Sequence, residues 1–247
     1  TATKIYAELV GNILQDTPSS QKYWHFVKLM GRSASHVALE VALQTHPPVT
    51  LISEEVSAKK MTLDEVVSLL VKAVVIRAIN GINFGVVLIP EGLIEFIPEM
   101  NQLISAINDA FGQVFLSASD SFEARKNNVL AFLEDNLVDL FESLPSFIQT
   151  ELLADRDSHG NLKVSQIPTE QLLLEMVQRK VAELLLNMDE HESTLGLSLS
   201  DSDKTTLRQF SFSGLTHFFG YEGRCGAPSF FDANYTFNLG LLVGSLV

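Results

Sequence analysis

Three short segments of the sequence combine a glycine with charged side chains directly after an apolar run. They are Met30-Gly31-Arg32, Pro90-Glu91-Gly92 and Tyr221-Glu222-Gly223-Arg224. A guanidinium is a forked donor suited to phosphate, and a helix that begins beside it adds free N–H groups. A carboxylate accepts hydrogen bonds from hydroxyl groups, and a phenol can donate one. If the segments meet, they suit a phosphorylated polyol; the alternative is three turns with ordinary solvated charges.

The elements expected around these segments alternate between helix and strand. In chain order they are a helix over 2–15, a strand over 23–29, a helix over 33–45, a strand over 47–53, a helix over 62–80 and a strand over 84–92. This order predicts an α/β fold with a mostly parallel sheet flanked by helices. Ligands of such sheets bind beyond the carboxyl ends of the strands. The three segments are therefore expected at one edge of the sheet.

Local patterns refine three of these elements. Residues 16–20, Asp-Thr-Pro-Ser-Ser, predict a turn or loop after the first helix. The helix over 33–45 carries apolar residues on two faces and is expected to be buried nearly all round. Thr62 and Glu65 have the spacing of a capping box, which predicts the start of the next helix.

The rest of the chain is predicted to leave the sheet and return to it. Residues 98–153 are expected to be helical, 154–166 a polar connector, and Pro168 the first turn of a helix to about Met188. A strand and loop over 216–228 and an apolar helix over 231–247 follow. The expected organisation is the first part of an α/β domain over 1–97, a helical insertion over 98–188, a linker over 189–213 and a return to the α/β domain over 214–247.

Composition and charge exclude several classes of protein. The chain has 247 residues and a formal net charge of −13, which argues against a nucleic-acid-binding surface. No apolar run is long enough for a membrane span. A single cysteine cannot form an internal disulfide, which favours a reducing, cytoplasmic location. Both ends of the sequence run directly into apolar segments, and we expect them to be cuts inside a longer polypeptide.

Other candidate sites are weaker than the three strand-end segments. Asp155, Asp157 and Gly160 are spaced as in a calcium loop, but His159 replaces an oxygen ligand and the twelfth position lacks a glutamate. The six histidines show no metal-ligand spacing with Cys225, whose thiol is expected to be packed. The Ser-Asp stretch over 198–203 is most simply a solvated loop.

Five longer stretches carry a resemblance to a known family. They are KYWHFVKLMGRSASHVALEVALQTHP, LISEEV, VLIPEGLIEFIPE, VSQIPTEQLL and HFFGYEGRCGAPSFFDANYTFNLG. In this order they resemble the long form of pyrophosphate-dependent phosphofructokinase, and only 189–213 is hard to match. The resemblance implies a phosphofructokinase-like fold. It also implies transfer of a phosphoryl group from pyrophosphate to the 1-hydroxyl of fructose 6-phosphate, with magnesium.

The resemblance also assigns roles to individual residues. It implies that the sugar phosphate is bound by Met30, Gly31, Arg32, Glu91, Tyr221, Glu222, Gly223 and Arg224. Tyr221 and Arg224 are expected at the 6-phosphate. Lys22 and Tyr23 match a pair that reaches the sugar-phosphate site of the adjacent subunit, so the working unit is expected to be a homodimer or a higher oligomer.

Two motifs of the family do not occur in this sequence. They are a Gly-Gly-Asp-Asp-Ser segment at pyrophosphate and magnesium and a Thr-Ile-Asp segment at the catalytic base; Thr62-Leu63-Asp64 is better explained as a capping box. The chain therefore resembles the acceptor-sugar half, with no catalytic residue of its own, and is expected to be inactive alone. Magnesium would be bound mainly by the missing N-terminal half. A non-catalytic subunit that binds fructose phosphates and an ATP-dependent 6-phosphofructokinase remain alternatives.

Overall fold

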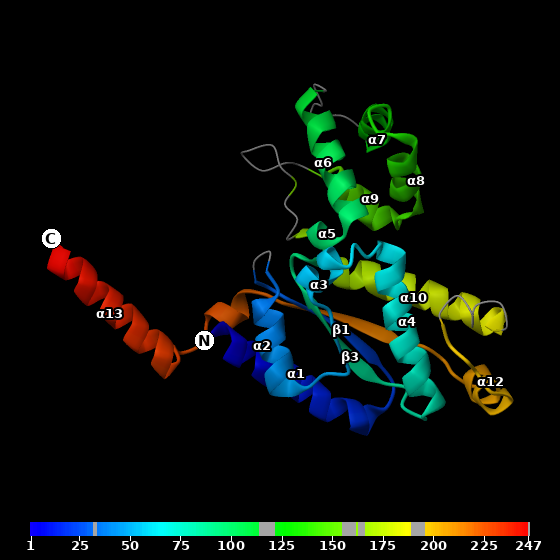
Figure 1. Cartoon of the computed structure of the whole chain (residues 1–247), viewed down its shortest axis with the longest axis horizontal. Helices are drawn as coiled ribbons and strands as arrows, with labels where there is room; N and C mark the ends of the chain where they lie inside the picture. Colours follow the sequence, from blue (N-terminus) through cyan, green and yellow to red (C-terminus); the bar gives the residue numbers. More distant parts are fainter. Residues whose placement is uncertain (32–33, 114–121, 155–161, 163–165, 189–195, 247) are drawn as a thin grey trace.

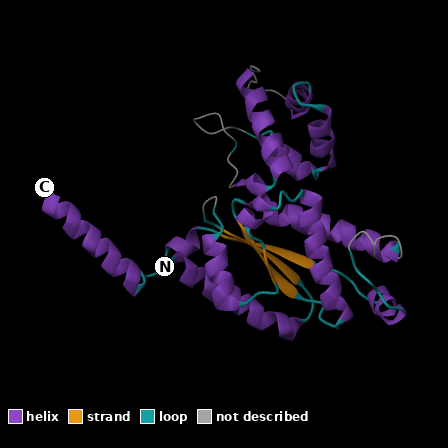
Figure 2. Cartoon of the chain, viewed as in Figure 1, coloured by secondary structure: helices purple, strands orange, loops and turns teal. Residues whose placement is uncertain are grey.

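The fold is a three-layer α/β/α arrangement around one parallel sheet. The computed structural model describes residues 1–31, 34–113, 122–154, 162, 166–188 and 196–246. Within them, four parallel strands lie in the order β2-β3-β1-β4. They are β1 (Trp24–Leu29), β2 (Val49–Thr50), β3 (Gly85–Pro90) and β4 (Gly214–Phe219). Helices cover both faces of the sheet (Figures 1 and 2). The predicted α/β class with a mostly parallel sheet is confirmed.

The strand β1 is the centre of the sheet, and its side chains alternate between two apolar clusters. Trp24 and Phe26 belong to a large cluster with α4 (Leu63–Ile79) and α10 (Thr169–Leu186). Val27 and Leu29 point to the other face, against α1 (Ala2–Ser20) and α2 (His36–Thr45). All six residues of β1 are buried. A strand buried on both faces explains why its sequence is mostly apolar, with His25 and Lys28 as its two buried polar residues.

The first helix continues five residues beyond its predicted end. The predicted turn over 16–20 was wrong, because α1 runs to Ser20 with Pro18 in its last turn. A proline in a helix leaves the carbonyl four residues earlier without its backbone donor. Here the hydroxyl of Thr17 donates to that carbonyl, Leu14 O, at 3.0 Å. Gln21 then ends the helix in the left-handed conformation, with φ 51°.

The second helix is less buried than its composition predicts. In α2 only Ala38 and Val41 are buried, whereas Leu39 and Leu43 are 46% and 62% exposed. The expectation of burial nearly all round was therefore wrong, because α2 packs against α1 and the sheet on one side only. The strand predicted over 47–53 is reduced to β2, and α3 (Ser53–Ala58) follows it. The capping box of Thr62 and Glu65 at the start of α4 is confirmed.

A group of helices follows β3. It contains α5 (Leu93–Phe96), α6 (Pro98–Gln113), α7 (Phe122–Leu130), α8 (Asp135–Ser143) and α9 (Ser146–Leu152), which lie together at one end of the molecule (Figure 1). The polar connector predicted over 154–166 lies mostly outside the described residues. Pro168 is the N-cap of α10 rather than part of its first turn.

The chain returns to the sheet through a further helix. α12 (Asp201–Arg208) lies within the range predicted as a linker. Ser200 and Asp203 form a capping box at its start, so the solvated loop predicted over 198–203 was wrong. Strand β4 and the 3₁₀ turn η2 (Tyr221–Arg224) come next.

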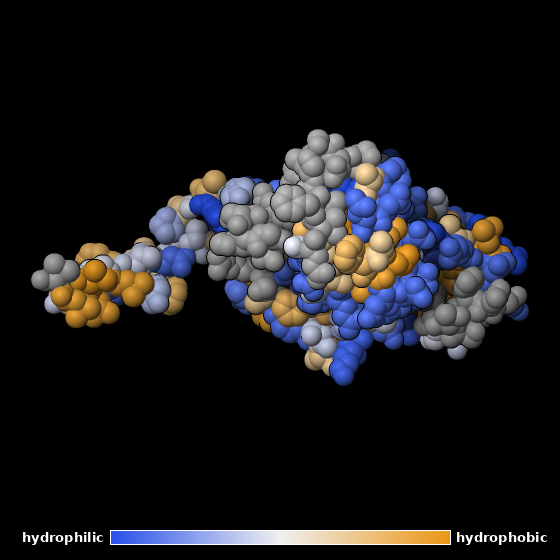
Figure 3. Space-filling view, turned by 90° about the horizontal axis from the view of Figure 1, so that it is seen from above, coloured by the Kyte–Doolittle hydropathy of each residue, from blue (hydrophilic) through white to orange (hydrophobic). Residues whose placement is uncertain are grey.

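The last helix, α13 (Phe230–Leu246), projects away from the sheet (Figure 1). None of its residues is buried, and its apolar side chains gather at one end of the space-filling view (Figure 3). The apolar helix predicted over 231–247 is confirmed as a helix. No helix within the described residues is both long and apolar enough to cross a membrane.

Gly85 makes room for the indole of Trp24, its neighbour on the adjacent strand. A Cβ atom at Gly85 would lie 2.8 Å from the Trp24 ring, which is completely buried. We expect Gly85→Ala to lower the free energy of unfolding by about 1–3 kcal/mol, because a packed core resists added volume. Gly11→Ala is the matched control, since nothing lies within 4 Å of that Cβ position. Gly11 is inside α1, so this control should stabilise by about 0.5–1 kcal/mol. Urea unfolding measures both; equal effects would contradict the packing argument.

Two histidines stack between β1 and β4. His25 Nδ1 and His217 Nε2 are 2.8 Å apart, and the ring centroids are 5.1 Å apart. Burial lowers the pKa of His25, the neighbouring His217 lowers it further, and Asp16 partly opposes the shift. Burial also lowers the pKa of His217. The folded chain therefore binds fewer protons than the unfolded chain below about pH 6.5, the ordinary histidine value.

Stability should consequently fall as the pH drops below about 6.5 and be insensitive to these two groups above it. We expect the double variant His25→Gln/His217→Gln to lose stability less steeply than the parent between about pH 6.5 and 5. Tyr23, which meets His25 edge to face at 6.5 Å, is kept in both proteins. Thermal unfolding at several pH values gives the comparison, and identical slopes would contradict this explanation.

Candidate functional site

The three strand-end segments follow the carboxyl ends of β1, β3 and β4. In the strand register Leu29 lies beside both Pro90 and Phe219. Met30, Glu91 and Gly220 therefore follow three neighbouring strands at the same edge of the sheet. The Met30 N–H donates to Phe219 O at 2.8 Å, which continues the pairing of β1 and β4 by one residue. For the described residues of these segments, the prediction that they meet at one edge of the sheet is confirmed.

Two carboxylates hold the backbone that connects β1 to α2. Glu91 Oε2 accepts a hydrogen bond from Gly31 N at 3.0 Å. Glu54 Oε1, at the start of α3, accepts one from Ser35 N at 2.9 Å, and this bond is the main cause of the lowered pKa of Glu54. Arg32 lies outside the described residues, between these two anchored positions. Glu54 was missed as a site residue, although its neighbourhood was quoted for the resemblance.

The turn η2 presents Tyr221 and Arg224 beyond the end of β4. Tyr221 is 72% exposed, and the Arg224 guanidinium lies 5.3 Å from the centre of its ring. Among the described residues, no carboxylate forms an ion pair with Arg224 within 4.0 Å. The carboxylate of Glu222 accepts from Gly220 N at 2.8 Å and so closes its own turn. Arg224 thus offers a guanidinium that is stacked but not neutralised by a direct partner.

The predicted packing of Cys225 was wrong. Its thiol is exposed and lies 3.3 Å from Tyr221 O. The residue follows η2, in which only Gly223 is buried and the other three residues are exposed. Cysteine usually behaves as a small apolar residue, which is why burial was predicted. Here the position of Cys225 after the turn sets its exposure.

Two ionisable residues near the site were not singled out from the sequence. Burial raises the pKa of the Glu95 carboxyl, and the like charge of Glu91 raises it further. Burial also raises the pKa of the Tyr6 phenol, with Glu222 and Glu91 raising it and Arg224 lowering it. Glu95 follows Glu91 by four residues, but only Glu95 lies in a helix, so helical spacing gives no signal for this pair. Tyr6 lies 24 residues before Met30, 85 before Glu91 and 215 before Tyr221, so no local pattern could have found it.

Lys22 and Tyr23 lie at the opposite edge of the sheet. They precede β1, whereas Met30 and Gly31 follow it. Six residues of strand separate the two pairs by roughly 20 Å. Lys22 is exposed and Tyr23 partly exposed. These two residues therefore do not share a site with Glu91 and Arg224 inside one chain. This separation is compatible with the prediction that they reach the site of an adjacent subunit.

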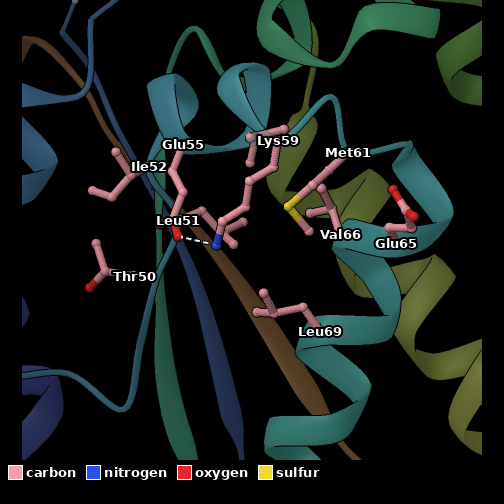
Figure 4. A pocket seen from close by; sticks show the side chains of 10 residues that line it. Thr50, Leu51, Ile52, Glu55, Lys59, Met61, Glu65, Val66 and Leu69 are labelled. Carbon is pink, nitrogen blue, oxygen red and sulfur yellow. Dashed lines mark hydrogen bonds and ion pairs between the residues drawn. The ribbon is translucent and has the colours of Figure 1, made fainter. Parts of the chain in front are cut away.

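A separate hollow lies at the β2 edge of the sheet and contains none of the predicted site residues. It has a volume of about 380 Å³ and is formed by β2, α3 and the start of α4 (Figure 4). Its walls are mostly apolar, and an ion pair of Glu55 and Lys59 lies in it, 2.5 Å between Oε1 and Nζ. This hollow gives no support to a phosphate site, because its only cation is already paired.

The described residues do not provide a metal centre. Among them, no three His, Cys, Asp or Glu side chains are placed to hold one ion. The calcium-loop candidate of Asp155, Asp157 and Gly160 lies outside the described residues. What the strand-end site offers is a carboxylate, backbone N–H groups, a phenol and a guanidinium around one sheet edge. These groups can hold hydroxyl and phosphate oxygens of a ligand.

Comparison with known proteins gives close relatives along the whole chain. No family model matches the sequence. The pyrophosphate–fructose 6-phosphate 1-phosphotransferase of Treponema pallidum is 48% identical over 98% of this chain and 39% of that protein. The enzyme of the same name from Porphyromonas gingivalis is 47% identical over 100% of this chain and 42% of that protein. Subunit beta 2 of the Arabidopsis thaliana enzyme is 45% identical over 100% of this chain and 39% of that protein. The chain thus spans about two fifths of the length of the curated relatives it matches.

Proposed function

We propose that this chain, which is 45–48% identical to parts of three pyrophosphate–fructose 6-phosphate 1-phosphotransferases, is the part of such an enzyme that binds fructose 6-phosphate. The complete enzyme would move a phosphoryl group from pyrophosphate to the 1-hydroxyl of this sugar. The chain by itself would not turn over. The residues proposed to bind the sugar phosphate are Met30, Gly31, Arg32, Glu91, Tyr221, Glu222, Gly223 and Arg224.

The single observation that carries the proposal is the convergence of Gly31, Glu91 and the turn η2 at the ends of three neighbouring strands. Glu91 would accept hydrogen bonds from sugar hydroxyls while it holds Gly31. The charge of Arg224 suits the 6-phosphate, since a guanidinium makes charge-assisted bonds to phosphate oxygens. Glu222, whose carboxylate closes its own turn, would act by shaping η2.

The remaining parts of the reaction are assigned to groups outside the described site. Magnesium neutralises charge on the transferred phosphoryl group when it is bound, and we propose that the rest of the enzyme holds it. Lys22 and Tyr23 would reach the sugar-phosphate site of a second subunit, which makes the working unit at least a dimer. A cytoplasmic location remains a prediction from the single cysteine.

Phosphorus NMR of the full-length enzyme that contains this chain tests the proposal. The enzyme is incubated with fructose 6-phosphate and magnesium, and either pyrophosphate or ATP is added. We expect fructose 1,6-bisphosphate with pyrophosphate only, and no product from residues 1–247 alone. Product with ATP only would overturn the choice of donor. Tight binding of fructose 6-phosphate without product from either donor would instead identify a regulatory subunit.

A further inference from the structure

We propose that Tyr6 is a positioning residue for the sugar-phosphate site. Its hydroxyl and ring contact the backbone of the turn η2 and hold the turn in place. The inference rests on the proposed function, since it assumes that Tyr221 and Arg224 of this turn bind the sugar phosphate. Tyr6 is 1% exposed and is closed off from a ligand on the surface. Its effect on binding would therefore pass through the turn.

The hydroxyl of Tyr6 contacts the carbonyl at which the turn begins. Tyr6 Oη donates to Gly220 O at 2.6 Å. The same carbonyl accepts the N–H of Gly223 at 3.2 Å, which is the hydrogen bond that closes the 3₁₀ turn. Gly220 N donates to Glu222 at 2.8 Å. The N–H and the carbonyl of Gly220 are thus both hydrogen-bonded. Of these three hydrogen bonds, only the one from Tyr6 comes from another element.

The ring of Tyr6 contacts the far side of the same turn. A Cβ atom at Gly223 would lie 2.3 Å from Cζ and 2.5 Å from Oη of Tyr6. No side chain fits there unless the turn or the ring moves. A Cβ at Gly226 would likewise lie 2.5 Å from Ile5, the residue beside Tyr6. Side chains of the first helix therefore pack closely against the backbone of the segment 220–226 at two positions.

Tyr6 is held rigidly enough to act as this support. Its ring belongs to the apolar cluster of α1, α2 and the sheet, with Val10, Val27 and Leu29. Burial raises the pKa of its phenol, and the charge of Glu222 raises it further, so the hydroxyl stays a donor at neutral pH. Because the sheet fixes the ring, the turn is placed relative to the same strands that carry Gly31 and Glu91.

Tyr6→Phe in the full-length enzyme removes the hydroxyl and keeps the ring. We expect the KM for fructose 6-phosphate to rise about fivefold, the value of one neutral hydrogen bond. The value of kcat should stay within about twofold, because weakened binding that is equal in ground and transition states appears in KM. Hydrogen exchange of the amides over 220–225 should be faster. The matched control, Tyr235→Phe, removes a hydroxyl from an exposed tyrosine of α13 and should change neither quantity.

A second pair of variants tests the ring contact. Gly223→Ala should raise the KM for fructose 6-phosphate by more than Tyr6→Phe does, because the added methyl group collides with the ring. Adding Tyr6→Leu removes the atoms of the collision and should restore part of the binding, whereas adding Tyr6→Phe should not. Additive losses in Gly223→Ala/Tyr6→Leu would overturn the steric part of the inference.

The outcomes separate this inference from the proposed function. Unchanged exchange over 220–225 and unchanged KM in Tyr6→Phe would overturn the role of Tyr6 even in an active enzyme. Faster exchange in that variant would support the contact between Tyr6 and the turn. If the parent enzyme did not use fructose 6-phosphate, the proposed function would be overturned while this contact stood.

Discussion

Replacing Lys28 by methionine is expected to lower the free energy of unfolding by about 3–5 kcal/mol. Lys28 is 3% exposed in the central strand, and its Nζ lies 3.1 Å from Glu170 Oε2 in the first turn of α10. The same nitrogen donates to Ile167 O at 2.9 Å and lies 4.6 Å from the ring centre of Phe218. Without the lysine, the Glu170 carboxylate would be left buried with no opposite charge. Equilibrium urea unfolding measures the loss.

Two controls show whether the loss comes from an unpaired buried charge. The double variant Lys28→Met/Glu170→Leu removes both charges and should regain most of the stability, because apolar replacement of a whole buried pair is often neutral. Lys59→Met removes a lysine from the exposed pair with Glu55 and should change stability by less than about 1 kcal/mol. A Lys28→Met variant as stable as Lys59→Met would show that the buried pair contributes nothing.

Arg224→Ala in the full-length enzyme should raise the KM for fructose 6-phosphate about 10- to 150-fold, with little change for pyrophosphate. One charge-assisted hydrogen bond to phosphate is worth about 1.5–3 kcal/mol. Arg224 is exposed and stacks on Tyr221, so its removal should leave the fold intact. Initial rates over a range of fructose 6-phosphate concentrations, at saturating pyrophosphate, give the measurement.

The matched variants for this experiment vary charge and position separately. Arg224→Lys keeps the charge but loses the fork of the guanidinium, and should fall between the parent and Arg224→Ala. Arg208→Ala removes an exposed arginine from the last turn of α12 and should leave the sugar KM unchanged. An Arg224→Ala variant with the sugar KM of the parent would remove Arg224 from the site.

Much of the fold could be read from local sequence patterns. The mostly apolar run before Gly31 and the continuous apolar run before Glu91 became β1 and β3, and the spacing of Thr62 and Glu65 marked the start of α4. These predictions succeed because burial on both faces and helix capping leave a signal within a few residues. They also placed Met30, Glu91 and the turn η2 together, since parallel strands end at one edge.

Other features depended on contacts that no local pattern contains. The turn predicted over 16–20 became helix because the Thr17 hydroxyl satisfies the carbonyl that Pro18 cannot. Leu39 and Leu43 of α2 are exposed because only one side of the helix meets a partner in this chain. Glu54 anchors Ser35 across 19 positions of sequence. In each case a residue's type was compatible with two outcomes, and its neighbours in space selected one.

The sequence by itself determined the parallel sheet, the position of the strand-end segments and the similarity to pyrophosphate–fructose 6-phosphate 1-phosphotransferases. Only the tertiary structure decided that Tyr6, at the start of the chain, supports a turn that is 214 residues away from it at Gly220. The physical reason is that apolar periodicity and capping act over a few residues. A hydrogen bond between α1 and η2 exists only after the sheet has brought both elements to the same edge.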